Sequence, residues 1–162
     1  MRGLHVIAGL LFTIAAVPAF AADFVVIRET LDVDRPVAVA WQRVGDYCAI
    51  ADWLKVSCAY ERGSGDVGTV RRLVNGTIAE VMVARTPLSY TYFQTDGTMA
   101  ATRYHGTLAA EAAGSSTTRL IYTLVYDQSA LASDSVRASE RARLESRFSG
   151  ALASMKSLIE AK

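Results

Sequence analysis

The chain has 162 residues, 51% of them hydrophobic, and its 17 Lys and Arg residues almost balance 16 Asp and Glu residues. A net charge so close to zero gives no reason to expect binding to nucleic acid or to an anionic membrane surface. The length suits one domain with a real hydrophobic core, and no stretch beyond residue 21 is long and apolar enough to insert stably into a membrane.

The first 21 residues have the pattern of a secretory signal peptide. Arg2 supplies the positive charge, residues 6–17 form the apolar run, and Ala19-Phe20-Ala21 is a cleavage site of the A-x-A type. The run is shorter than the roughly 20 residues of a membrane-spanning helix, which argues against an uncleaved anchor. We therefore predict a signal peptide over 1–21, a single domain over 22–162, and a periplasmic or secreted location.

The exported part is expected to begin with a strand over 24–32, where apolar and polar residues alternate. A helix is predicted next, with Asp34 as its N-cap and Pro36 in its first turn. A second short helix is predicted over 49–54. Two short helices therefore follow the first strand.

Six further strands are predicted from stretches rich in alternating, β-branched and aromatic residues. Asn75-Gly76 is the strongest turn signal between them, because this pair adopts the positive φ angles of a tight hairpin. The predicted strands cover residues 56–61, 69–74, 77–85, 89–95, 101–112 and 117–127.

Residues 133–162 contain no Pro and only one Gly, Gly150, so they predict a long C-terminal helix. An amphipathic helix that follows a run of antiparallel strands must lie across the sheet, because neither element can bury its apolar face alone. The sequence thus predicts an α+β fold, with a hollow between sheet and helix. The apolar residues at helical spacing are Leu144, Phe148, Leu152, Met155 and Ile159.

Cys48 and Cys58 are the only two cysteines of the chain. In an exported protein such a pair favours a disulfide, which would stabilise the fold by about 2–3 kcal/mol over so short a loop. Two buried thiols are the alternative. We expect no metal and no other cofactor, because His105 is the only histidine after the signal peptide and no CxxC or HxxxH spacing occurs.

Several stretches of the chain resemble the START/SRPBCC helix-grip superfamily, and within it the polyketide cyclase/dehydrase-like branch. They are PVAVAWQRVGDYCAIADWL, GTVRRLVNG, RTPLSYTY and TRYHGTL. The resemblance extends over nearly all of 24–162 and implies a curved antiparallel sheet of about seven strands, wrapped around a long C-terminal helix with a cavity between them. Leu54-Lys55 and Gly97-Thr98-Met99 stand where members often have prolines, so we expect the loops at the cavity mouth to differ.

Strand alternation assigns one set of side chains to the face that the resemblance places toward the helix and cavity. The wall is then mostly aliphatic and aromatic with a few polar atoms, which is typical of a site for an apolar small molecule. Gly106 is included because a missing side chain leaves room for the helix or a ligand. The predicted ligand-binding residues are Arg71, Leu73, Glu80, Met82, Tyr104, Gly106, Tyr122 and Phe148.

Glu80 lies among apolar neighbours in AEVMV, so its carboxyl group could have a raised pKa and act as an acid or base, with Tyr104 as a second weak candidate. The alternative, which we favour, is that Glu80 pairs with Arg71 across the hairpin. His105 has the opposite parity and should face outward. No catalytic residue is therefore assigned.

Three functions remain open. The leading hypothesis is an exported protein that binds a lipid-like or aromatic molecule without changing it. The resemblance also implies a second, a polyketide cyclase- or dehydratase-like enzyme that uses the same cavity. The resemblance implies a third as well, an accessory protein of periplasmic alcohol oxidation, in which the surface serves a protein partner and the core is filled.

Overall fold

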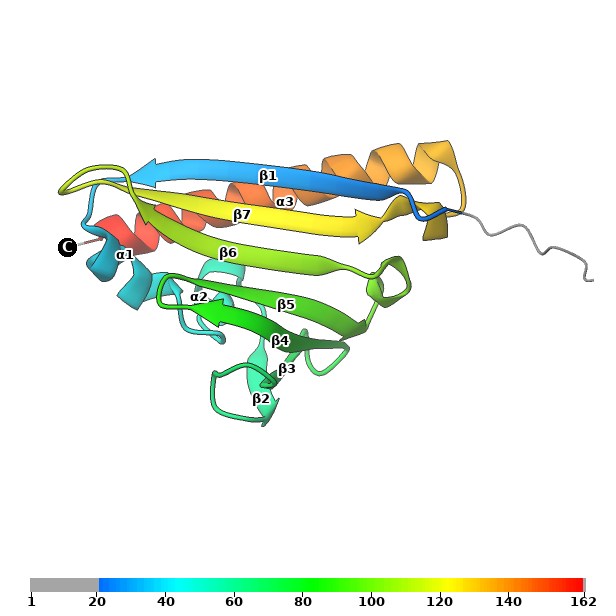
Figure 1. The fold of residues 1–162 in the computed structure, drawn as a ribbon, viewed down its shortest axis with the longest axis horizontal. Helices are drawn as coiled ribbons and strands as arrows, with labels where there is room; N and C mark the ends of the chain where they lie inside the picture. The colour runs from blue at the N-terminus through cyan, green and yellow to red at the C-terminus, as the bar shows by residue number, and fades with distance from the viewer. Residues whose placement is uncertain (1–20, 162) are drawn as a thin grey trace, which may run out of the picture.

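The computed structural model describes residues 21–161, which form a curved antiparallel sheet covered on one face by a long helix (Figure 1). This is the predicted α+β helix-grip fold. The strands are β1 Phe24–Val33, β2 Cys58–Arg62, β3 Val70–Leu73, β4 Ile78–Thr86, β5 Ser89–Asp96, β6 His105–Ala112 and β7 Thr118–Asp127. The helices are α1 Val37–Val44, α2 Ile50–Leu54 and α3 Asp134–Glu160, with short 3₁₀ helices η1 Ala100–Thr102 and η2 Gln128–Ala130.

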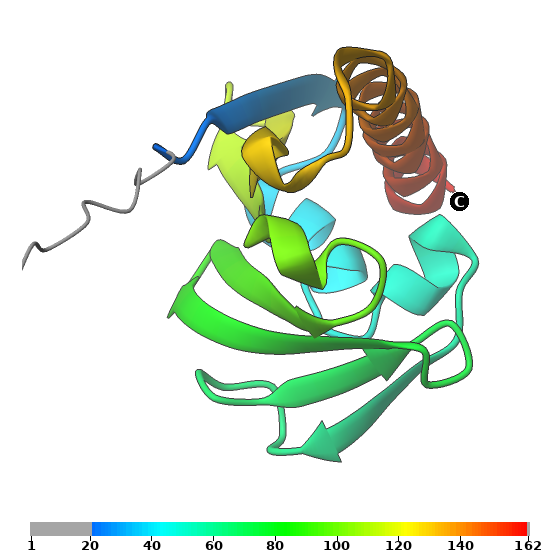
Figure 2. The same cartoon turned by 90° about the vertical axis from the view of Figure 1, so that its right-hand side faces the viewer.

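The seven strands lie in the order β1-β7-β6-β5-β4-β3-β2. From β2 to β7 each strand pairs with the next one in sequence, whereas β1 pairs with β7 from Phe24 opposite Asp127 to Val33 opposite Thr118. The segment with α1 and α2 therefore connects the two edge strands of the sheet. It passes beneath α3 on the concave side (Figure 2).

Ser133 is the N-cap of helix α3, and its side chain accepts a hydrogen bond from the backbone N–H of Val136 at 3.3 Å. The helix packs along β1 and β7, and α1 lies near its C-terminal end (Figure 1). Its buried stripe contains the five residues predicted from helical spacing and Ala151: Leu144, Phe148, Ala151, Leu152, Met155 and Ile159. Burial of these side chains against the sheet, worth about 1.5–3 kcal/mol for each large one, holds the helix in place.

The predicted start of the first helix is wrong by two residues. Pro36 occupies the N-cap position of α1 and makes no side-chain hydrogen bond to the helix. Asp34 instead donates its backbone N–H to the Glu160 carboxylate at 2.8 Å, so it connects the end of β1 to the end of α3.

The predicted strand over 101–112 begins four residues too early. Ala100–Thr102 form η1, and Arg103 follows with a φ of 53°, in the left-handed region. The chain turns a corner here before β6 starts at His105. Tyr104 lies between this corner and the first residue of β6.

The structure contains the predicted Cys48–Cys58 disulfide, with 5.5 Å between the two Cα atoms. It joins the segment before α2 to the first residue of β2. The predicted signal peptide lies outside the described residues, apart from Ala21. Among residues 21–161, no helix has the length and hydrophobicity needed to cross a membrane.

Candidate functional site

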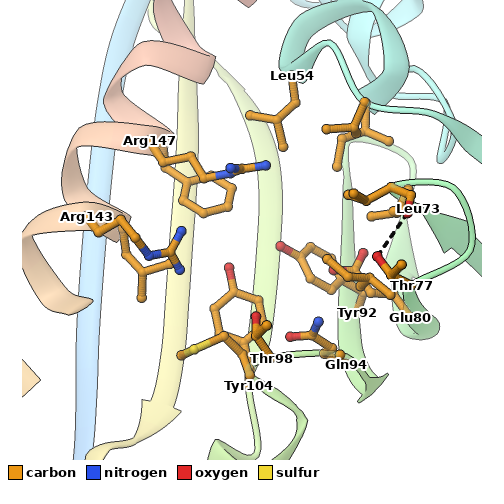
Figure 3. A pocket seen from close by; sticks show the side chains of 18 residues that line it. Leu54, Leu73, Thr77, Glu80, Tyr92, Gln94, Thr98, Tyr104, Arg143 and Arg147 are labelled. Atoms are coloured by element: carbon orange, nitrogen blue, oxygen red, sulfur yellow. Dashed lines mark hydrogen bonds between the residues drawn. The ribbon is translucent and has the colours of Figure 1, made fainter. Parts of the chain in front are cut away.

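A cavity of about 460 Å³ lies between the middle of α3, helix α2 and the concave face of strands β3, β4 and β5 (Figure 3). Most of its wall is apolar, as expected for a small-molecule site. Helix α2 and the segment after it contribute Ile50, Leu54 and Val56, while α3 contributes Leu144 and Phe148. The other lining residues are Leu73, Val74, Thr77, Ile78, Glu80, Tyr92, Gln94, Gly97, Thr98, Met99, Tyr104, Arg143 and Arg147.

Four of the eight residues predicted to bind ligand line this cavity: Leu73, Glu80, Tyr104 and Phe148. The other four share the buried face of the sheet but do not line the cavity: Arg71, Met82, Gly106 and Tyr122. Alternation thus identified the inward face correctly. It could not tell which inward residues other side chains cover.

Tyr92 lies against two of the four residues that do not line the cavity, Gly106 and Tyr122. A Cβ atom on Gly106 would lie 2.2 Å from the Tyr92 hydroxyl, so the glycine makes room for this ring and not for the helix or a ligand. Tyr122 lies behind the cavity wall, with its hydroxyl 3.0 Å from that of Tyr92 and its ring 4.4 Å from the ring of Phe148. The role expected of Gly106 is therefore corrected.

Met82 lies farther along β4, past the end of the cavity. It lines a separate pocket of about 70 Å³ together with Tyr47 and Tyr90. Arg71 packs on the rings of both tyrosines. Met82 is therefore not part of the wall of the main cavity.

Arg71 and Glu80 form a buried ion pair across the β3–β4 hairpin, as the favoured alternative predicted. Nε and Nη2 of Arg71 both donate to Oε2 of Glu80, at 2.9 Å and 2.6 Å, and Nη1 donates to the carbonyl of Tyr47. The guanidinium carbon lies 4.0 Å from the centre of the Tyr47 ring. Burial raises the pKa of Glu80 and the Arg71 charge opposes that shift, so Glu80 is a partner of Arg71 and not an isolated acid.

Two tyrosine hydroxyls are among the hydrogen-bonding groups of the cavity wall. Tyr92 and Tyr104 point their hydroxyls toward the cavity centre, beside Gln94 (Figure 3). Burial raises the pKa of both tyrosines well above the ordinary value, so they are neutral donors at neutral pH. They can orient an oxygen of a ligand without adding charge.

Sequence reasoning missed several lining residues. Tyr92 and Gln94 alternate along β5 with the same parity as Tyr90, so alternation alone could have included them. Arg143 and Arg147 are exposed residues of α3, each directly before a buried one, and nothing in helical periodicity predicts that long side chains bend back over the mouth.

His105 faces away from the cavity. Its ring packs against Phe93 at 4.7 Å, and its Nδ1 lies 2.7 Å from the carbonyl oxygen of Arg103. Within residues 21–161, no cluster of three or more His, Cys, Asp or Glu residues could hold a metal ion.

The fold is that of a helix-grip protein with a cavity between the sheet and α3. A family model described as "Polyketide cyclase / dehydrase and lipid transport" matches residues 25–160, so the chain belongs to this family within the SRPBCC superfamily. A comparison with curated proteins found no match.

Solved structures share the fold at low sequence identity. A protein from Thermobifida fusca superimposes with a TM-score of 0.71 at 20% identity over 83% of this chain and 92% of its own. The Zhui aromatase/cyclase from a Streptomyces species gives 0.70 at 17% identity, over 85% and 94%. The protein XoxI from Bacillus cereus gives 0.68 at 18% identity, over 83% and 96%. At these identities the likeness shows the fold alone.

Proposed function

We propose that this chain is an exported binding protein that holds an apolar small molecule in the cavity between the sheet and α3. The observation that carries the proposal is a cavity of about 460 Å³ whose wall is mostly aliphatic and aromatic. This volume falls within the range of about 300–1,000 Å³ that is usual for ligand pockets. The family description, which includes lipid transport, supports the same interpretation.

Binding without chemistry is favoured over catalysis by the state of Glu80. It is the only carboxylate on the cavity wall, and it is bound to the guanidinium of Arg71. No histidine lines the cavity, so the described wall offers no pair of free groups for proton transfer.

Export is part of the proposal and is supported by two features. The N-terminal residues have the signal-peptide pattern described above, and the Cys48–Cys58 disulfide suits an oxidising compartment. The expected location is therefore the periplasm or the medium.

The test is a fluorescence titration with the neutral apolar probe N-phenylnaphthylamine. The native protein should bind the probe, and Leu54→Trp should weaken binding because the larger ring fills the cavity beneath α2. If the probe loses burial equivalent to about two methylene groups, each worth about 0.8 kcal/mol, its affinity for the variant should be roughly tenfold weaker.

His105→Trp is the matched control, because it adds the same ring on the outer face of the sheet. It should leave probe affinity unchanged. A wild-type protein that binds no probe would overturn the proposal, and an accessory role through the protein surface would then become the better explanation.

An enzyme of the polyketide cyclase or dehydratase kind is the second candidate, favoured by the neutral hydroxyls of Tyr92 and Tyr104. Two such donors could hold a ligand carbonyl oxygen and stabilise negative charge that develops on it. Tyr104→Phe should then abolish turnover of a poly-keto test substrate while probe binding stays within twofold of wild type. Absence of turnover by the wild-type protein would contradict this candidate.

A further inference from the structure

Two arginines from α3 lie at the mouth of a mostly apolar cavity. Arg143 and Arg147 lie one turn apart, and both are exposed yet line the cavity. Their guanidinium groups extend from α3 toward the space above the Tyr104 hydroxyl (Figure 3). The positive charge of both arginines acts on that hydroxyl and partly opposes the rise in pKa that burial causes. The mouth is therefore positively charged close to a hydrogen-bond donor.

The charges around the cavity do not cancel. Glu80, the only acidic residue on the wall, is neutralised by Arg71, which is fully buried behind it. Arg143 pairs with Glu140 through two hydrogen bonds, from Nε to Oε2 at 2.8 Å and from Nη2 to Oε1 at 2.5 Å. No ion pair or hydrogen bond joins Arg147 to another side chain of residues 21–161. Among the described residues, Arg147 is therefore the arginine of the mouth whose charge no carboxylate pairs.

We infer that the ligand is an amphipathic anion, with an apolar tail inside the cavity and a carboxylate or phosphate head at the mouth between Arg143 and Arg147. This inference rests on the proposed binding function and specifies its ligand class. A guanidinium is suited to such a head, because its planar set of donors matches the oxygens of a carboxylate or phosphate in a bidentate arrangement. The Tyr104 hydroxyl supplies a further donor below the arginines.

Apolar side chains are available on two sides of the cavity to contact the tail. Phe148 and Leu144 form the α3 side, and Leu54, Ile50 and Leu73 form the opposite side. A neutral ligand with the same tail would make the same apolar contacts, but it would gain from the arginines only a hydrogen bond to an uncharged oxygen and no ion pair. The head group should therefore appear as a difference in affinity between matched ligands.

The experiment is displacement of bound N-phenylnaphthylamine by three ligands with the same tail: dodecanoate, dodecyl phosphate and dodecanol, each below its micelle concentration. At least one anion should displace the probe at about tenfold lower concentration than dodecanol, in line with a charge-assisted hydrogen bond. Whichever anion is stronger identifies the head group as carboxylate or phosphate.

The double variant Arg143→Gln/Arg147→Gln should lose this preference while its affinity for dodecanol stays the same. Arg147→Lys should keep most of it, since the charge is retained. Arg141→Gln is the control on the same helix, because Arg141 pairs with Glu145 and does not line the cavity. It should behave as wild type.

Equal affinity of wild type for dodecanol and both anions would overturn the inference and leave the proposed binding function in place. A preference for anions that persists in the double variant would also overturn it. If neither the neutral probe nor dodecanol binds, the binding function itself fails, and the ligand class fails with it.

Discussion

Arg71 and Glu80 form a buried ion pair beside the cavity, and we expect this pair to stabilise the fold and not to take part in a reaction. The exposed fraction of the side chain is 0% for Arg71 and 7% for Glu80, and they face each other in the β3–β4 register. Three tyrosine rings, of Tyr47, Tyr90 and Tyr92, surround the guanidinium. The pair is satisfied internally, so its removal should affect stability before it affects binding.

Glu80→Gln should lower the free energy of unfolding by about 3–5 kcal/mol, because it leaves the Arg71 charge buried without a counter-charge. Urea unfolding measures this loss. Glu61→Gln is the control, since Glu61 pairs with Arg72 at the surface and its loss should cost at most about 1 kcal/mol. A Glu80→Gln protein as stable as wild type would show that the pair contributes little to the fold.

For single residues, the sequence predicted which charged side chains pair better than it predicted which side chains fill the space beside a residue. The Arg71–Glu80 pairing follows from hairpin register, which Asn75-Gly76 signals locally. The space beside Gly106 is filled by Tyr92 from the neighbouring strand. Which side chain fills a gap depends on three-dimensional packing between strands, and alternation within one strand does not contain that information.

Helix α2 is the element whose position depends most on a covalent bond. It has only five residues, too few to be stable alone, yet Ile50 and Leu54 form one side of the cavity. The disulfide joins Cys48, two residues before α2, to Cys58, the first residue of β2. The same bond thus supports both the fold and the shape of the mouth.

Cys48→Ala/Cys58→Ala should lower stability by about 2–3 kcal/mol, since the unfolded chain regains the entropy of the open loop. Probe affinity should fall as well, because α2 is held less firmly. Thermal unfolding and probe titration measure the two effects. Thiol labelling of the denatured wild-type protein without reductant should find no reactive cysteine, and two reactive thiols would contradict the disulfide.

Most elements could be predicted because their signals are local. Alternation located all seven strands, and helical spacing located α3. The mistakes are at corners of the chain. Pro36, and not Asp34, is the N-cap of α1. The first residues of the strand predicted over 101–112 instead form η1 and the turn at Arg103. At corners the backbone follows contacts made elsewhere in the fold, such as the bond between Asp34 and Glu160.

In the whole molecule, α3 covers the part of the sheet formed by β1 and β7, and the cavity lies beside the part formed by β3 to β5. Helix α3 packs along β1 and β7, while strands β2 to β5 curve away beneath α2 (Figure 2). The layout of elements and the hollow between them could be inferred from the sequence. The arginines at the mouth could not, because their place above the cavity depends on how far α3 stands from β3 and β4.

The central claim is that an apolar ligand occupies the cavity between α3 and strands β3 to β5. Amide chemical shifts of the isotope-labelled protein, recorded by NMR while dodecanol is added, test this claim most directly. We predict that the shifts that change will cluster at wall residues such as Leu54, Leu73, Gln94 and Phe148, with none at Val26, which is 57% exposed on β1. Changes confined to the outer face of the sheet, or no change at saturating dodecanol, would contradict the account.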